Sequence, residues 1–179
     1  MSSNNLVHID FKQKFKDKIE YLKENLAPLG KDPGNSCASL TFMNILDVLD
    51  REELKNQYFC NLAIPFSAMA AYTSKNGSKG TCGALYGAIA AIGIITGGKE
   101  KLVKFEVSKL YSKVIMFANK FERKFGSLSC EEICGYNTGT ELKEYVRNRA
   151  WENKCVNFVL FAIEQVGKIT AKELQEKWI

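Results

Sequence analysis

Apolar side chains recur at intervals of three and four residues along most of the chain, a spacing that predicts amphipathic helices. The first helix is expected from His8 to Leu26, because Pro28 and Gly30 follow it and end it. Further helices are expected at residues 37–49, from 51 for a short stretch, at 58–72, 81–96, 99–125, 130–134, 141–166 with a break near Asn153, and 171–178. No segment alternates between apolar and polar positions as a half-buried strand would. The sequence therefore predicts an all-α fold, a compact multi-helix bundle.

Two of the expected helices have unusual compositions. The helix at about 81–96 carries several glycines within an apolar run, which indicates close helix packing at the centre of the bundle. This run is shorter than the ~20 residues that span a bilayer, so no membrane segment is expected. The longest helix, at about 99–125, has an apolar seam that should pack along another helix, from this chain or from a partner, and that is a candidate homo-oligomer surface. The seam residues are Val103, Val107, Leu110, Val114, Phe117, Phe121 and Phe125.

The chain of 179 residues is long enough to bury one hydrophobic core, and a single helical domain over residues 1–179 is expected. Its hydrophobic fraction of 46% and charged fraction of 25% are typical of a globular protein. Pro65 should kink or interrupt its helix, and the polar residues 73–80 form the clearest loop. A polar loop that leads directly into a buried helix is a common place for a functional site.

The net charge of +5 at pH 7 adds little, because basic and acidic residues are interleaved along the first helix. No nucleic-acid surface is therefore expected. The opening residues Met-Ser-Ser-Asn-Asn lack the charged-then-apolar pattern of a secretory signal, which favours a cytoplasmic location. In a reducing compartment, six cysteines are more often metal ligands or redox groups than structural disulfides. The candidate chemistry therefore lies in the cysteines.

Three cysteines share one local setting at expected helix starts. Cys37, Cys82 and Cys130 each follow a serine or a threonine, the residue types that cap helix N-termini. Their thiols should lie in the first helical turn, where unpaired backbone N–H groups and the helix dipole favour the thiolate. If the three helix starts converge, they form a site for a cysteine-bound metal or for reversible disulfide chemistry. The alternative is that these cysteines are small buried hydrophobic residues of the core.

The other cysteine spacings and the single histidine carry less information. No Cys-x-x-Cys is present, so the spacings of zinc knuckles and of thioredoxins are both missing. Cys130 and Cys134 lie four residues apart on one helix face and could hold one metal together. His8 is expected at the surface, and without a second histidine a Cys/His catalytic dyad has little support.

Four cysteine motifs occur in the order found in a known family. They are Asn35-Ser36-Cys37-Ala38, Gly80 to Ala88 around Cys82, Phe125 to Ile133 around Cys130, and Lys154-Cys155. Over residues 35–165 the chain resembles the C-GCAxxG-C-C family of redox-active proteins, with Cys-Gly-Ala-x-x-Gly in place of Gly-Cys-Ala-x-x-Gly. The helix within residues 1–30, Cys60 and Cys134 lie outside this resemblance.

The resemblance implies that Cys37, Cys82, Cys130 and Cys155 form one redox site. A similar region occurs in split-Soret-type cytochromes, where an iron–sulfur centre accompanies the haem, and this favours an iron–sulfur cluster here. A [2Fe–2S] cluster is expected, since four thiolates complete its coordination. Cys134 is a candidate substitute ligand. The resemblance identifies no redox partner protein and no catalytic residue, so the sequence does not decide whether the protein is an enzyme.

Three alternatives stay open. A metal-free protein could use the same cysteines for thiol–disulfide exchange, with one thiol attacking and another resolving. Zinc could occupy the four-thiolate site and serve stability alone. The chain could also be a non-redox helical interaction module that associates through the seam from Val103 to Phe125. We expect electron transfer or redox sensing by a cluster-bearing protein.

Overall fold

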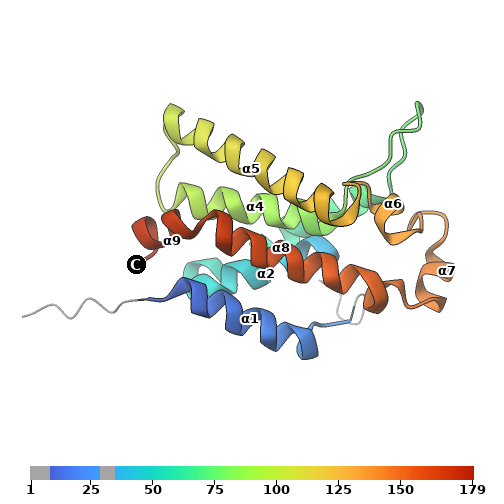
Figure 1. Cartoon of the computed structure of the whole chain (residues 1–179), viewed down its shortest axis with the longest axis horizontal. Helices are drawn as coiled ribbons and strands as arrows, with labels where there is room; N and C mark the ends of the chain where they lie inside the picture. The colour runs from blue at the N-terminus through green and yellow to red at the C-terminus, as the bar shows by residue number, and fades with distance from the viewer. Residues whose placement is uncertain (1–8, 29–34) are drawn as a thin grey trace, which may run out of the picture.

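The computed structural model describes residues 9–28 and 35–179. Within these ranges the chain forms helices and turns, and its extended pairings are two isolated antiparallel bridges, Thr73 with Lys79 and Thr81 with Ser129. The predicted all-α fold is confirmed, and Figure 1 shows its helices packed as a bundle. His8 and residues 29–34, which include the expected stop at Gly30, lie outside the described ranges.

The order of the helices follows the apolar pattern of the sequence. Among the described residues, no helix has both the length and the apolar character needed to cross a membrane. In the described part of the chain, three short elements of other helix types connect the α-helices: the 3-10 helices η1 and η2 and the π-helical turn η3. The elements are α1 (Phe11–Asn25), α2 (Cys37–Leu49), η1 (Glu52–Leu54), α3 (Gln57–Ala68), η2 (Met69–Ala71), α4 (Gly83–Gly97), α5 (Lys104–Phe125), α6 (Cys130–Cys134), α7 (Leu142–Arg147), η3 (Trp151–Cys155), α8 (Val156–Ile169) and α9 (Ala171–Lys177).

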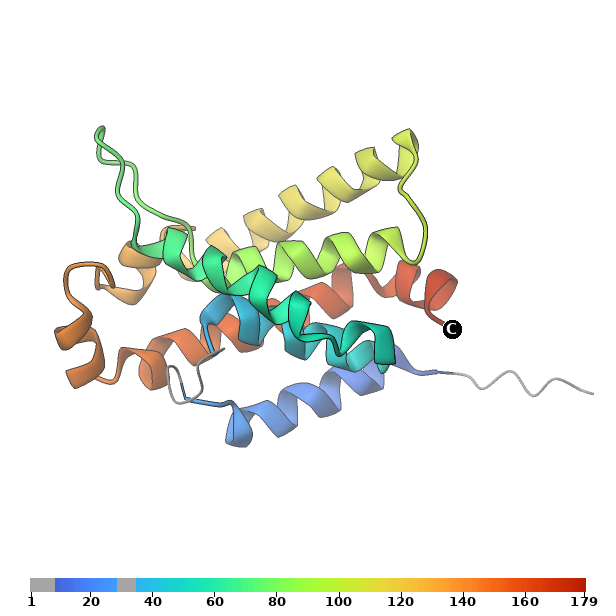
Figure 2. The same ribbon diagram turned by 180° about the vertical axis from the view of Figure 1, so that it is seen from behind.

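Helix α4 lies at the centre of the bundle. It packs against α2, α3, α5 and α8, and Figures 1 and 2 show it between α5 on one side and α8 with α2 on the other. Its contact with α2 depends on Gly87, where a Cβ atom would lie 2.2 Å from the carbonyl oxygen of Ala38. A Cβ atom at Gly93 would meet no described atom within 4 Å. The prediction that the glycines permit close packing is therefore confirmed for Gly87 and wrong for Gly93.

The apolar seam of α5 packs inside this chain. Helix α5 contacts α4 and α8, and Phe117 and Phe121 are fully buried. The aromatic packing continues onto α8, where the ring centroid of Phe158 lies 6.3 Å from that of Phe121 and 4.7 Å from that of Phe125. At the other end of the seam, Val103 is 62% exposed. The seam thus packs on helices of its own chain, while a homo-oligomer stays a prediction.

Several boundaries differ from the predicted ones for physical reasons. Helix α5 begins at Lys104 rather than at 99. The carboxylate of Glu106 accepts a hydrogen bond of 3.0 Å from the backbone N–H of Val103 and so caps the helix at Lys104. Helix α3 continues through Pro65 to Ala68, so an interruption at Pro65 is wrong, whereas a kink there stays a prediction. The expected break near Asn153 is present as the π-helical turn η3. The loop at residues 73–80 extends away from the bundle, as Figure 2 shows.

Candidate cysteine site

The starts of α4 and α6 are joined by a short antiparallel pairing. The backbone N–H of Cys82 donates to the carbonyl oxygen of Leu128 at 2.9 Å, and the N–H of Cys130 donates to that of Gly80 at 2.9 Å. Both bonds flank the bridge between Thr81 and Ser129. This pairing fixes Cys82 and Cys130 on neighbouring backbone segments.

The start of α2 approaches the start of α4 at Gly83. A Cβ atom on Gly83 would lie 3.1 Å from the Cβ of Cys37 and 2.8 Å from the hydroxyl oxygen of Ser67. That hydroxyl accepts a hydrogen bond of 3.0 Å from the backbone N–H of Ala38. The absence of a side chain at Gly83 therefore lets Cys37 and Cys82 come together.

Cys155, the fourth cysteine of the resemblance, comes from the C-terminal part of the chain. Cys155 ends the π-helical turn η3, at the start of α8, and the hydroxyl of Tyr145 donates a hydrogen bond of 3.3 Å to its sulfur. Cys37 and Cys155 lie close enough that each shifts the pKa of the other. The resemblance grouped these cysteines with Cys82 and Cys130, and the structure brings all four together.

Cys134 also belongs to this group. Its sulfur lies 4.0 Å from that of Cys130, one helical turn away in α6. We call the five residues Cys37, Cys82, Cys130, Cys134 and Cys155 the cysteine cluster. Cys60 lies half-buried on α3 and is not one of its members.

The helix-start positions are correct for two of the three predicted cysteines. Cys37 and Cys130 are the first residues of α2 and α6, and Ser36 and Ser129 cap these helices with their hydroxyl groups. Cys82 is itself the N-terminal cap residue of α4, which begins at Gly83. The prediction is therefore one residue off here, because Thr81 is held in the bridge with Ser129.

The thiols of the cluster are arranged in pairs. Cys130 lies beside Cys134, Cys37 beside Cys155, and Cys82 interacts electrostatically with both pairs. Across residues 9–28 and 35–179, no three or more Cys, His, Asp or Glu side chains are placed so that they could hold a single metal ion. The cluster is therefore a set of neighbouring thiol pairs rather than a tetrahedral cage.

Hydrogen bonds between neighbouring thiols and burial raise the pKa of the three helix-start thiols in the metal-free protein. Burial raises the pKa of Cys82 to about 12, against two opposing backbone hydrogen bonds at the start of α4. Hydrogen bonding to Cys134, followed by burial, raises the pKa of Cys130. Hydrogen bonding to Cys155, again followed by burial, raises the pKa of Cys37. The predicted thiolate preference at these helix starts is thus wrong, since desolvation and neighbouring thiols exceed the effect of the helix dipole.

In each pair the other thiol, Cys134 or Cys155, has a lowered pKa and loses its proton more readily. The hydrogen bond with Cys130 is the main cause that lowers the pKa of Cys134 to about 7, and the ammonium group of Lys154 contributes. The pKa of Cys155 is lowered mainly by its hydrogen bond with Cys37, with further contributions from Tyr145 and Lys154. Sequence reasoning missed Tyr145, and Lys154 was noted only as the neighbour of Cys155.

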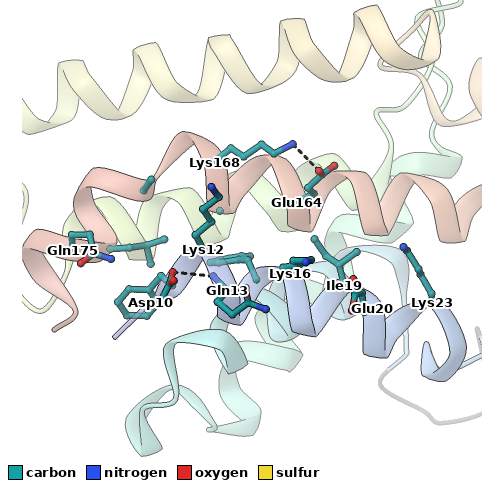
Figure 3. A pocket seen from close by; sticks show the side chains of 15 residues that line it. Asp10, Lys12, Gln13, Lys16, Ile19, Glu20, Lys23, Glu164, Lys168 and Gln175 are labelled. Carbon is teal, nitrogen blue, oxygen red and sulfur yellow. Dashed lines mark hydrogen bonds and ion pairs between the residues drawn. The ribbon is translucent and has the colours of Figure 1, made fainter. Parts of the chain in front are cut away.

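The cluster is closed to solvent on most sides. The exposed fraction is 0% for Cys134, 3% for Cys82, 4% for Cys155 and 8% for Cys130, while Cys37 is half-buried. A groove of about 740 Å³ lies elsewhere, between α1 and the α8–α9 segment (Figure 3). Its lining includes several lysines together with Phe15 and Leu174. No cysteine lines this groove. The chemistry of the thiols is therefore separate from it.

The fold and the cysteine cluster define a helical protein with a buried multi-thiol centre. The chain matches the model of the family described as "Putative redox-active protein (C_GCAxxG_C_C)" over residues 35–169, and it belongs to this family. No curated protein and no solved structure matches it. Helices α1 and α9 lie outside the matched residues, so the groove between α1 and the α8–α9 segment is built largely by parts that the family model does not cover.

Proposed function

We propose that the protein binds a [2Fe–2S] cluster for electron transfer or redox sensing, with Cys37, Cys82, Cys130 and Cys155 as ligands and Cys134 as a candidate substitute. The observation that supports this proposal is the convergence of cysteines from four separate parts of the chain on one buried place. Thiolates are the usual ligands of such clusters, and four of them complete the coordination. The family match supports a redox role for the same residues.

The pairing of the thiols favours two irons over one zinc ion. A tetrahedral zinc site needs four donors around one point, and no such group occurs among the described residues. In a [2Fe–2S] cluster each iron takes two protein thiolates, so Cys37 and Cys155 would serve one iron, and Cys130 with Cys82, or with Cys134 as its substitute, would serve the other. When bound, the cluster would supply a one-electron redox couple. The donor set fits the cluster by its chemistry.

Side chains around the cluster would influence its redox potential. Lys154 brings a positive charge to Cys134 and Cys155, and its ammonium group donates a hydrogen bond of 2.8 Å to the Cys134 carbonyl oxygen. Hydrogen bonds to ligand sulfurs, such as that from Tyr145, stabilise the more negative reduced state. The low exposure of four of the five cysteines would limit the access of water. These contacts would both hold a negative centre and set its potential.

Iron, zinc and acid-labile sulfide in anaerobically purified protein test the proposal. Iron and sulfide in equal amounts, lost in Cys82→Ala and kept in the matched control Cys60→Ala, would support it. Zinc without sulfide would favour a structural site. A colourless, correctly folded protein without metal, whose thiols oxidise in pairs, would instead support metal-free thiol–disulfide chemistry.

A further inference from the structure

Helix α6 holds two thiols that are already in contact. It has one turn, with Cys130 as its first residue and Cys134 as its last, and the two sulfurs are 4.0 Å apart. Helical geometry places Cα atoms four residues apart at roughly 6 Å, within the range that a disulfide spans. The two sulfurs must approach by about 2 Å to form the bond.

The end of α6 can accommodate this movement. The carbonyl group of Cys134 is bonded to the ammonium group of Lys154 rather than to a following helical turn. Gly135 follows with a φ of 81°, a left-handed conformation that glycine adopts without strain. The helix therefore ends at Cys134. A movement of Cys134 towards Cys130 disturbs no longer helix.

Burial determines which oxidant can reach the pair. Cys134 is 0% exposed and Cys130 is 8% exposed. Exchange with a protein disulfide requires a sulfur that a second macromolecule can approach in line, and neither thiol offers this. Hydrogen peroxide is small enough to enter with little opening of the fold. The pair is thus suited to a small peroxide and closed to protein disulfides.

The geometry points to a peroxide-driven, reversible disulfide between Cys130 and Cys134. One thiolate of the pair attacks a peroxide oxygen, the O–O bond breaks, and the departing hydroxide takes up a proton and becomes water. The resulting sulfenic acid is then attacked by the other sulfur, which loses its proton. The S–O bond breaks, the S–S bond forms, and a second water leaves. Two thiols are oxidised while one hydrogen peroxide is reduced to two waters.

This inference deepens the proposed function. The release of iron by peroxide rests on that function, whereas the disulfide itself does not. Cys130 is a proposed ligand of the cluster, and a disulfide to Cys134 would remove that ligand. Peroxide would then release the iron, which gives the redox-sensing role a defined trigger. The disulfide itself requires no metal and can be examined in the metal-free chain.

Peptide mapping of the full, metal-stripped chain tests the disulfide. Trypsin releases residues 125–143, which contain Cys130 and Cys134 and no other cysteine. After treatment with hydrogen peroxide and blocking of free thiols, we expect this peptide to lose two hydrogen atoms and to take up no blocking reagent. A thiol reductant should restore both thiols. Cys134→Ser should abolish the internal disulfide, while Cys60→Ser should leave it unchanged, with circular dichroism confirming the helical fold of each variant.

Other products would overturn the inference. A disulfide between Cys37 and Cys155 alone would do so, as would sulfinic acid at Cys130 without a disulfide, or no oxidation of peptide 125–143. Iron analysis of the untreated protein is a separate measurement. A lack of iron would refute the proposed cluster and leave the disulfide standing, whereas failure of the disulfide in the metal-free chain would refute this inference whatever the iron content.

Discussion

The hydroxyl of Tyr145 donates a hydrogen bond of 3.3 Å to the sulfur of Cys155, between two buried residues ten positions apart. This bond helps to lower the pKa of Cys155, because it stabilises the thiolate more than the thiol. Replacing Tyr145 by phenylalanine keeps the ring and removes the donor. Tyr145→Phe should therefore raise the pKa of Cys155 in the metal-free protein.

The thiolate absorbance in the ultraviolet, followed against pH, measures this change. Tyr111 on α5 is 64% exposed, whereas Tyr145 is buried. Tyr111→Phe is therefore a suitable control and should leave the thiolate titration unchanged. An unchanged titration in Tyr145→Phe would show that the hydroxyl does not act on Cys155.

The glycines of α4 offer a matched pair of substitutions. In Gly87→Ala the new methyl group would be 2.2 Å from the carbonyl oxygen of Ala38, so α2 and α4 must separate. We expect a loss of about 1–3 kcal/mol in the free energy of unfolding, the usual cost of overpacking. In Gly93→Ala the methyl group meets no described atom, and the better helix propensity should add about 1 kcal/mol. Urea unfolding of both variants checks the opposite signs, and equal effects would refute the contact.

The aromatic contact between α5 and α8 should be a main source of stability. Phe121 is fully buried, and its ring centroid lies 6.0 Å from that of Phe161 on α8. Phe121→Ala should lower the free energy of unfolding by about 3–5 kcal/mol through lost burial and the cavity left behind. Phe105→Ala, at a residue 67% exposed on the same helix, should change it by less than about 0.5 kcal/mol. Similar losses of unfolding free energy in both variants would contradict the burial of Phe121 between α5 and α8.

The buried thiol of Cys82 should make stability depend on alkaline pH. Its pKa is raised to about 12 in the folded metal-free protein, against about 8.5 for an unfolded cysteine. Its contribution to stability is therefore complete below pH ~8.5 and is lost as the pH rises towards the folded value, because the unfolded chain then binds fewer protons. Between pH ~8 and ~10 the wild type should lose about 2 kcal/mol relative to Cys82→Ala. Parallel stability curves for the two proteins would contradict the buried, protonated state.

Local signals in the sequence predicted the parts of the site that depend on local chemistry. The start of α2 at Cys37 and of α6 at Cys130 follow from the caps Ser36 and Ser129, which act within one turn. Thr81 has the same appearance, yet its backbone pairs with Ser129 and the helix begins later. That pairing joins segments that are far apart in the sequence, so no local pattern predicts it.

The charge state of the cluster could not be predicted for a similar reason. The dipole of a helix is visible in its sequence, whereas the burial of Cys82 and the neighbours of Cys155 arise only when separate helices meet. Tyr145 and Lys154 act on the thiols through such tertiary contacts. The sequence therefore located the cysteines better than it predicted their reactivity.

The hydrogen bonds that join Gly80 to Cys130 and Cys82 to Leu128 affect how the chain folds. Helical bundles usually fold through contacts between residues near in sequence, which form quickly. These two bonds instead close a long loop that contains α4 and α5, and closing such a loop costs chain entropy before any thiol contact is gained. The cysteine cluster should therefore assemble late, after the helices around it, and in a nascent chain it cannot be complete until Cys155 has been synthesised.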